Sequence, residues 1–192
     1  CTIPPSGACG DGAIGAGEDC DDGNNVDHDG CSAACKAEST GPNDVCPGEV
    51  IALTGTGADA RKGTVSSNTS LAYSQYSGSC GGGTGADAVY VVTPDVTGLL
   101  TAKITGTFDA LLYARRTCAD TKTEVACNDA PGPKGGEQIK IAVTKNEPVY
   151  LFVDGYSGSA GSCVLDVDVA TAFCGNGVAE APEVCDDGNA VS

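Results

Sequence analysis

The chain has 192 residues, among them 12 Cys, 28 Gly and three Phe, and it contains neither Met nor Trp. So few large apolar side chains build only a thin hydrophobic core, which leaves no room for a large cofactor and requires disulfide bonds to supply part of the stability. The formal charge of −16, from 26 acidic and 10 basic residues, excludes nucleic acids and anionic membranes as partners and favours divalent cations.

The cysteines indicate where the protein works. They recur at regular spacings, and His28 is the single histidine, so the pattern is typical of disulfide bonds formed in an oxidising compartment rather than of zinc sites. The apolar runs, such as residues 151–153, are far shorter than the roughly 20 residues that cross a bilayer. We expect an extracellular or cell-surface protein with no transmembrane segment.

An internal repeat organises both ends of the chain. Residues 9–26 and 174–191 share the spacing of their cysteines and a Cys-Asp-Asp-Gly-Asn block. The first copy continues to Cys31 and Cys35, whereas the second ends at Ser192 before its third and fourth cysteines. We therefore expect residues 1–8 to be the end of a preceding repeat or a linker, 9–35 a cysteine-rich acidic repeat, 36–45 a linker, and 171–192 a second, truncated repeat.

Residues 9–35 resemble the cysteine-rich repeat of surface and secreted proteins of myxobacteria and related bacteria. The pattern of that repeat is C-G-N-G-x-x-E-x-x-E-x-C-D-D-G-N-x-x-x-x-D-G-C-S-x-x-C. Asp11 and Gly15 depart from it, and residues 174–192 match its first two thirds. The resemblance implies an extracellular, disulfide-bonded module without catalytic activity.

Cysteine pairing in the repeats is partly constrained. Two bridges are expected inside the first repeat, with all three connectivities open, among Cys9, Cys20, Cys31 and Cys35. Bridges to another chain, or to further sequence of a longer array, are expected for Cys1, Cys174 and Cys185. Lipid modification is a further interpretation of Cys1.

Between Cys20 and Cys31 the first repeat packs carboxylates and amides into a Gly-containing loop. Such a loop suits Ca²⁺, which takes about 6 to 8 oxygen ligands. A solvated loop pinned by a disulfide is the alternative, because Asp, Asn and Gly are also the standard turn formers. The expected calcium ligands are Asp21, Asp22, Asn24, Asp27 and Asp29, with Glu18 as a further candidate.

From residue 46 to residue 170 the pattern changes to short alternating runs bounded by Gly, Pro, Asn and Asp, which is typical of an all-β sandwich or barrel. The alternation is clear at Leu165, Val167 and Val169, and their neighbours Asp166 and Asp168 are expected to face water. Strands are expected at residues 49–54, 71–76, 88–93, 98–105, 108–115, 123–127, 137–144, 148–154 and 163–170.

A second resemblance rests on residues 108–113, residues 118–129 and residues 148–156. Their succession is similar to the pre-peptidase C-terminal domain, which is attached to secreted bacterial proteases and surface proteins. The resemblance covers residues 46–170 and implies a jelly-roll-like β-sandwich that binds matrix or polysaccharide and sometimes calcium. The fold expected for the chain is all-β, a jelly-roll-like β-sandwich flanked by small, disulfide-rich, loop-dominated repeats.

Five cysteines fall in the expected sandwich. Cys118 and Cys127 lie nine residues apart across an expected hairpin, so we predict a bond between them. Cys46, Cys80 and Cys163 compete for the remaining bond, which leaves one of them for a partner elsewhere.

Disulfide-linked acidic repeats around a β-sandwich favour a structural function. We predict an adhesive cell-surface protein that self-associates end to end into a stalk, fibre or filament, stabilised by disulfides and Ca²⁺. The alternative is an accessory domain of a larger secreted enzyme. No catalytic activity is expected, because only bridged cysteines lie near His28 as nucleophiles. In the alternative, carbohydrate or matrix binds at a face lined by Tyr73, Tyr76, Tyr150 and Tyr156.

Overall fold

The structure is a computed structural model that describes residues 8–21, 23–25, 31–36, 43–57, 60–70, 72–82, 84–130 and 136–171. No helix within these ranges has the length and apolarity to cross a membrane. The two helices described are short 3-10 turns, η1 (Thr121–Thr123) and η2 (Tyr156–Gly158). The strands are β1 (Glu49–Val50), β2 (Arg61–Asn68), β3 (Ser77–Gly78), β4 (Gly81–Gly82), β5 (Ala88–Val92), β6 (Gly98–Gly106), β7 (Ala110–Arg115), β8 (Glu124–Asn128), β9 (Gln138–Val143), β10 (Val149–Gly155) and β11 (Ser162–Thr171).

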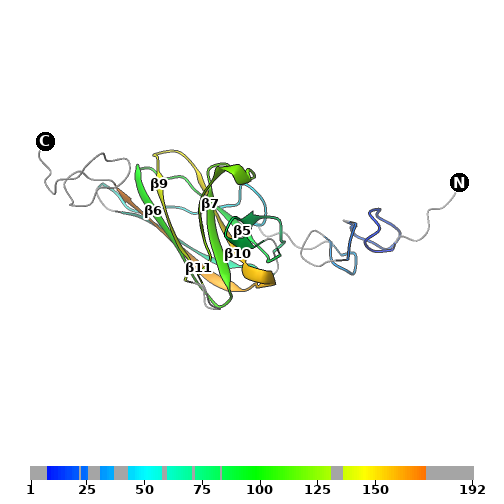
Figure 1. The fold of residues 1–192 in the computed structure, drawn as a ribbon. Helices are drawn as coiled ribbons and strands as arrows, with labels where there is room; N and C mark the ends of the chain where they lie inside the picture. The colour runs from blue at the N-terminus through cyan, green and yellow to red at the C-terminus, as the bar shows by residue number, and fades with distance from the viewer. Residues whose placement is uncertain are drawn as a thin grey trace, which may run out of the picture.

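The longer strands form two sheets that pack face to face, and Figure 1 shows β6 and β9 in one layer and β5, β7 and β10 in the other. One sheet has four strands in the order β2-β11-β6-β9, and the other has five in the order β1-β5-β10-β7-β8. Strands β3 and β4 pair separately as a small hairpin. The prediction of an all-β sandwich is confirmed.

The core between the sheets follows from the alternation of the sequence. In β11 the side chains of Leu165, Val167 and Val169 are buried, while Asp166 is exposed and Asp168 half-buried on the opposite face. Strands β6 and β9 alternate in the same way. The five-stranded sheet contributes Ala88, Tyr90, Val92, Ala110, Leu112, Ala114, Val149, Leu151 and Val153 to the same cluster.

The five-stranded sheet is also buried on its outer face, because β5, β7 and β10 are apolar on both sides. Val89, Tyr113 and Phe152 form a second cluster there. Residues 72–82, the covering segment, pack on it: the ring of Tyr76 lies 5.2 Å from that of Phe152, centroid to centroid. The outer face of the four-stranded sheet has no such cover among the described residues, since β2, β6 and β9 expose alternate side chains there.

Two expected strands differ in the structure, and one long strand was not expected. Strand 49–54 shrinks to β1, and the described part of 71–76 contains no strand. Strand β2 was not predicted, because its sequence has no alternation of apolar residues. It forms the edge of the four-stranded sheet. Its inward positions include Arg61, Gly63 and Ser67, so the strand is held by its ladder with β11 more than by its own apolar area.

Candidate functional site

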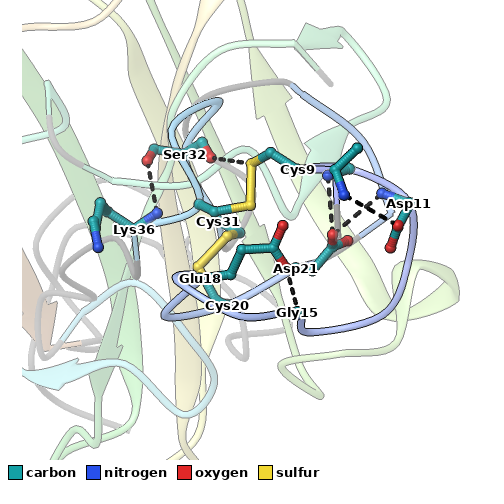
Figure 2. Close-up of a disulfide and its surroundings, with 12 residues drawn as sticks. Cys9, Asp11, Gly15, Glu18, Cys20, Asp21, Cys31, Ser32 and Lys36 are labelled. Carbon is teal, nitrogen blue, oxygen red and sulfur yellow. Dashed lines mark hydrogen bonds between the residues drawn. A yellow bond between two sulfur atoms is a disulfide. The ribbon is translucent and has the colours of Figure 1, made fainter. Parts of the chain in front are cut away.

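The cysteine-rich repeat is closed by two disulfide bonds, Cys9–Cys35 and Cys20–Cys31, whose Cα atoms lie 5.5 and 5.7 Å apart (Figure 2). This is one of the three connectivities that the spacing left open. The two bonds bring the start, middle and end of the repeat together, although the described residues here contain almost no regular secondary structure.

Asp21 organises the loop between these bonds. Its Oδ2 accepts hydrogen bonds from the N–H groups of Gly10 (3.0 Å) and Asp11 (3.2 Å), and its Oδ1 accepts from Gly12 and Gly23, both at 2.8 Å (Figure 2). Desolvation raises the pKa of Asp21, but these four donors outweigh it and lower the pKa below its ordinary value. Each carboxylate oxygen therefore accepts two backbone hydrogen bonds, one for each lone pair, so the charge of Asp21 stabilises the backbone of the loop.

The structure describes only some of the predicted calcium ligands. Asp22, Asp27 and Asp29 lie outside the described residues, as does His28. Glu18, Asp21 and Cys35 are close enough to share an ion, but the sulfur of Cys35 is in a disulfide bond. The carboxylate of Glu18 accepts the N–H of Gly15 at 2.5 Å. Calcium binding by this loop stays a prediction.

Bridges to other chains also stay a prediction. They depend on Cys1, Cys174 and Cys185, and all three lie outside the described residues. The same holds for end-to-end assembly into a stalk or filament.

The predicted Cys118–Cys127 bond is wrong. Cys118 bonds to Cys46, and Cys127 bonds to Cys80. Cys127 lies within the β7–β8 ladder opposite Tyr113, whereas Cys118 lies beyond the end of β7, so nearness in sequence does not bring the two sulfurs together. The observed bonds instead tie the β7–β8 hairpin to the covering segment at Cys80 and to the segment before β1 at Cys46.

Cys163 is the cysteine left over in the sandwich, and it is a buried free thiol. Burial raises its pKa to about 11, which keeps it protonated and unreactive. We expect the native protein to leave Cys163 unlabelled by iodoacetamide and the unfolded protein to label it. Comparing the labelled peptides of native and denatured protein tests this, with Cys163→Ser as the control; rapid labelling of native Cys163 would contradict it.

The tyrosines expected on a sugar-binding face are spread over different environments. Tyr73 is buried, and Tyr76 and Tyr150 are half-buried against the cluster around Phe152. Tyr156 is the exposed one, at 43%. These four rings do not form an open aromatic platform.

The described residues instead place two grooves on the four-stranded sheet. One is an open groove of about 300 Å³ lined by the outward side chains of the sheet centre, and the other is a shallow, open groove of about 480 Å³ at the end of the sheet next to it. The side chains that line the central groove are Lys62, Thr64, Thr101, Lys103, Gln138, Asp166 and Asp168. The end groove is lined chiefly by Ser66, Asn68, Thr105, Thr107, Ser162 and Val164.

The central groove is polar and internally ordered. Lys62 pairs with Asp168 at 3.1 Å from Nζ to Oδ2, and the hydroxyl of Thr64 donates to Asp166 at 2.7 Å. Lys103 lies across from Asp166 in the ladder and forms no ion pair with a described residue. Sequence reasoning missed this site, although the polar residues at every second position of 62–68 were a signal for it.

Comparisons with known proteins give separate matches for the cysteine-rich repeat and for the larger part of the chain. A family model described as "Domain of unknown function (DUF4215)" matches residues 6–36. No curated protein sequence matches the chain significantly.

Among solved structures, the pre-peptidase C-terminal domain of a collagenase from Bacillus anthracis matches at 16% identity and a TM-score of 0.38, covering 54% of this chain and 86% of that chain. The periplasmic inhibitor of g-type lysozyme PliG from Aeromonas hydrophila matches at 12% identity and a TM-score of 0.39, covering 62% and 96%. The family match falls on the cysteine-rich repeat that Asp21 and two disulfides hold together.

Proposed function

We propose that this chain is an extracellular accessory module that binds a polysaccharide on the outer face of its four-stranded sheet. The observation that carries the proposal is the contrast between the two sheets. One outer face is sealed by the covering segment and two disulfides, whereas the other presents two adjoining grooves, and most of the residues that line them carry a polar side chain. Four disulfide bonds among the described residues favour an oxidising compartment outside the cytoplasm.

The groove chemistry suits a hydroxyl-rich polymer. Carboxylates accept hydrogen bonds, ammonium groups donate them, and threonine hydroxyls and Gln138 do both, so sugar hydroxyls meet both kinds of partner. The pairs Lys62–Asp168 and Thr64–Asp166 hold side chains in place before a ligand arrives, which lowers the entropy cost of binding. A face without aromatic rings binds each sugar weakly, so affinity would come from many sugars along one chain.

Affinity electrophoresis in gels that contain soluble polysaccharides of different charge and linkage tests this function. We expect at least one polymer to retard the native chain, and the Lys103→Ala and Gln138→Ala variants to lose roughly five- to tenfold in affinity each, as for one lost hydrogen bond to a charged or polar group. Lys122→Ala is the matched control, because Lys122 is exposed on η1, outside both grooves. Retardation that depends on Tyr156 and not on Lys103 would contradict the assignment.

A further inference from the structure

The outer face of the five-stranded sheet encloses a group of buried acids. Asp87 and Asp154 are both 0% exposed. Asp87 precedes Ala88 and Asp154 follows Val153, and Ala88 and Val153 pair in the antiparallel β5–β10 ladder. The two carboxylates therefore come from facing positions of neighbouring strands and from the same side of the sheet, where Cβ atoms lie about 5 Å apart.

Further ionisable groups lie around this pair. Asp44, from the segment before β1, is also 0% exposed and raises the pKa of Asp87. The buried cation that acts on Asp87 is Arg115 of β7, whose guanidinium carbon lies 4.6 Å from the ring centre of Phe152 and 5.2 Å from that of Tyr113. Burial raises the pKa of Tyr113, and Asp154, Asp87 and Glu124 of β8 raise it further, so the phenol stays neutral.

Two of these acids hold the covering segment in place of a strand partner. Oδ2 of Asp87 accepts the N–H groups of Gln75 and Tyr76, both at 2.8 Å, and Oδ1 of Asp44 accepts the N–H of Tyr73 at 2.8 Å. The N–H of Asp87 donates in turn to the carbonyl of Tyr73 at 2.9 Å. Residues 73–76 thus rest on the sheet through carboxylates.

The other oxygen of Asp87 explains how a buried acid is tolerated here. Oδ1 is buried and makes no hydrogen bond to any described residue, and none of the ion pairs between described residues involves Asp87. An ionised oxygen in that position is costly. A proton on Oδ1 removes the charge beside Asp154 and Asp44 and leaves Oδ2 free to accept from Gln75 and Tyr76.

We propose that Asp87 carries a proton in the folded protein at acidic to neutral pH, and that loss of this proton releases residues 73–76 from the sheet. The covering segment is then a pH-sensitive latch over the cluster around Phe152, tethered at Cys80 by its disulfide. Burial, the largest cause, raises the pKa of Asp87 to about 7, in agreement with the geometry.

The direction of the pH effect follows from linkage. The pKa of Asp87 is raised on folding from an unfolded value of about 3.9, so its contribution is fully present below that value and is lost as pH rises through about 7. Between pH 5 and pH 8 the ratio of folded to unfolded protein is expected to fall by up to about 100-fold on account of Asp87 alone.

Chemical denaturation of the full chain from pH 5 to pH 8.5 tests the latch. Asp87→Asn mimics the protonated acid and does not ionise in the unfolded chain, so it is expected to lack most of the fall in stability that the native protein shows between pH 5 and pH 8. Asp166→Asn, an exposed acid of β11, is the control and keeps the fall. Amide exchange at Gln75 and Tyr76 is expected to quicken in the native protein above pH 7 beyond its intrinsic pH dependence, and to show no such excess in Asp87→Asn.

Three results would overturn the proposal. One is parallel pH profiles for the native protein and Asp87→Asn. Another is a carboxyl titration of Asp87 by carbon NMR with a midpoint below pH 5, which needs no variant. The third is a rise in stability with CaCl₂ that a chelator reverses and Asp87→Asn abolishes, because a metal ion and not a proton would then balance the charge. These results are independent of polysaccharide binding, which concerns the other sheet.

Discussion

Replacing Cys46 and Cys118 together with Ala is expected to lower the free energy of unfolding of the sandwich by about 4 kcal/mol. The bond closes a span of 72 residues, and loop-closure entropy assigns a crosslink of that length roughly this value. The Cys80–Cys127 bond spans 47 residues, so the same argument gives about 4 kcal/mol for its removal. Either loss is a large part of the roughly 5 to 15 kcal/mol by which domains are stable.

The position of the two bonds makes the effect specific. Both anchor segments over the outer face of the five-stranded sheet, so their loss is expected to expose the cluster around Phe152 as well as to destabilise the fold. Denaturant titration of each double variant measures the free energy, and binding of a hydrophobic dye reports exposure of the cluster. The Cys20→Ala/Cys31→Ala variant is the control, since that bond lies in the repeat. An unchanged midpoint for both sandwich variants would contradict the assigned connectivity.

The sandwich was visible in the sequence wherever one face of a strand is apolar and the other polar. Leu165, Val167 and Val169 alternate with Asp166 and Asp168, and the structure buries the first set and turns the second outward. A strand of this composition has only one orientation that buries its apolar side, so its pattern and its place agree. The same reasoning located β6 and β9.

Strand β2 could not be predicted from alternation because several of its inward positions hold polar residues or glycine. Arg61 points inward at the start of the strand, where its Nε donates to Asp95 at 2.8 Å. Gly63 has no side chain because Ile51 packs against it: a Cβ there would lie 2.6 Å from Cγ2 of Ile51. Polar and missing side chains at inward positions hide the period of a strand.

For residues 71–76 the prediction was wrong in the opposite direction, because a strand was expected and the described part contains none. Its alternating apolar residues predicted a strand, but the donors of residues 73, 75 and 76 go to Asp44 and Asp87, which are 29 and 11 to 12 residues away in sequence. No local pattern announces that a carboxylate replaces a neighbouring strand. The wrong Cys118–Cys127 bond has the same origin, because separation in sequence says nothing about which segments cover a sheet.

The acidic loop of the repeat shows how one composition serves two purposes. Asp and Gly residues around Cys20 match a calcium loop and a network of turns equally well in sequence. In the structure Asp21 accepts four backbone N–H groups, two of them from Gly10 and Gly12, which follow Cys9 in the repeat pattern. The first Asp of the Cys-Asp-Asp-Gly block thus orders the backbone of the repeat, and calcium binding by the loop stays a prediction.

Replacing Arg115 with Met is expected to destabilise the sandwich by about 3 kcal/mol or more at pH 8. Met preserves the packing over Phe152 and Tyr113 but removes the buried positive charge that lowers the pKa of Asp87. It also removes the hydrogen bond from Nη2 to the carbonyl of Ser77 (2.7 Å), which lies in the covering segment. The uncompensated charge of Asp87 and the lost hydrogen bond to Ser77 therefore both weaken the attachment of the covering segment.

The pH dependence of this loss separates charge from packing. Arg115 lowers the pKa of Asp87, so in Arg115→Met the Asp87 carboxyl keeps its proton to a higher pH. The guanidinium stabilises the native protein most at pH values where Asp87 is ionised, so its removal costs most stability there. The difference in unfolding free energy between native protein and Arg115→Met is expected to widen from pH 5 to pH 8, while Lys122→Met, an exposed control on η1, stays within about 0.5 kcal/mol throughout. A difference that is equal at both pH values would assign Arg115 a packing role only and leave Asp87 without an electrostatic partner.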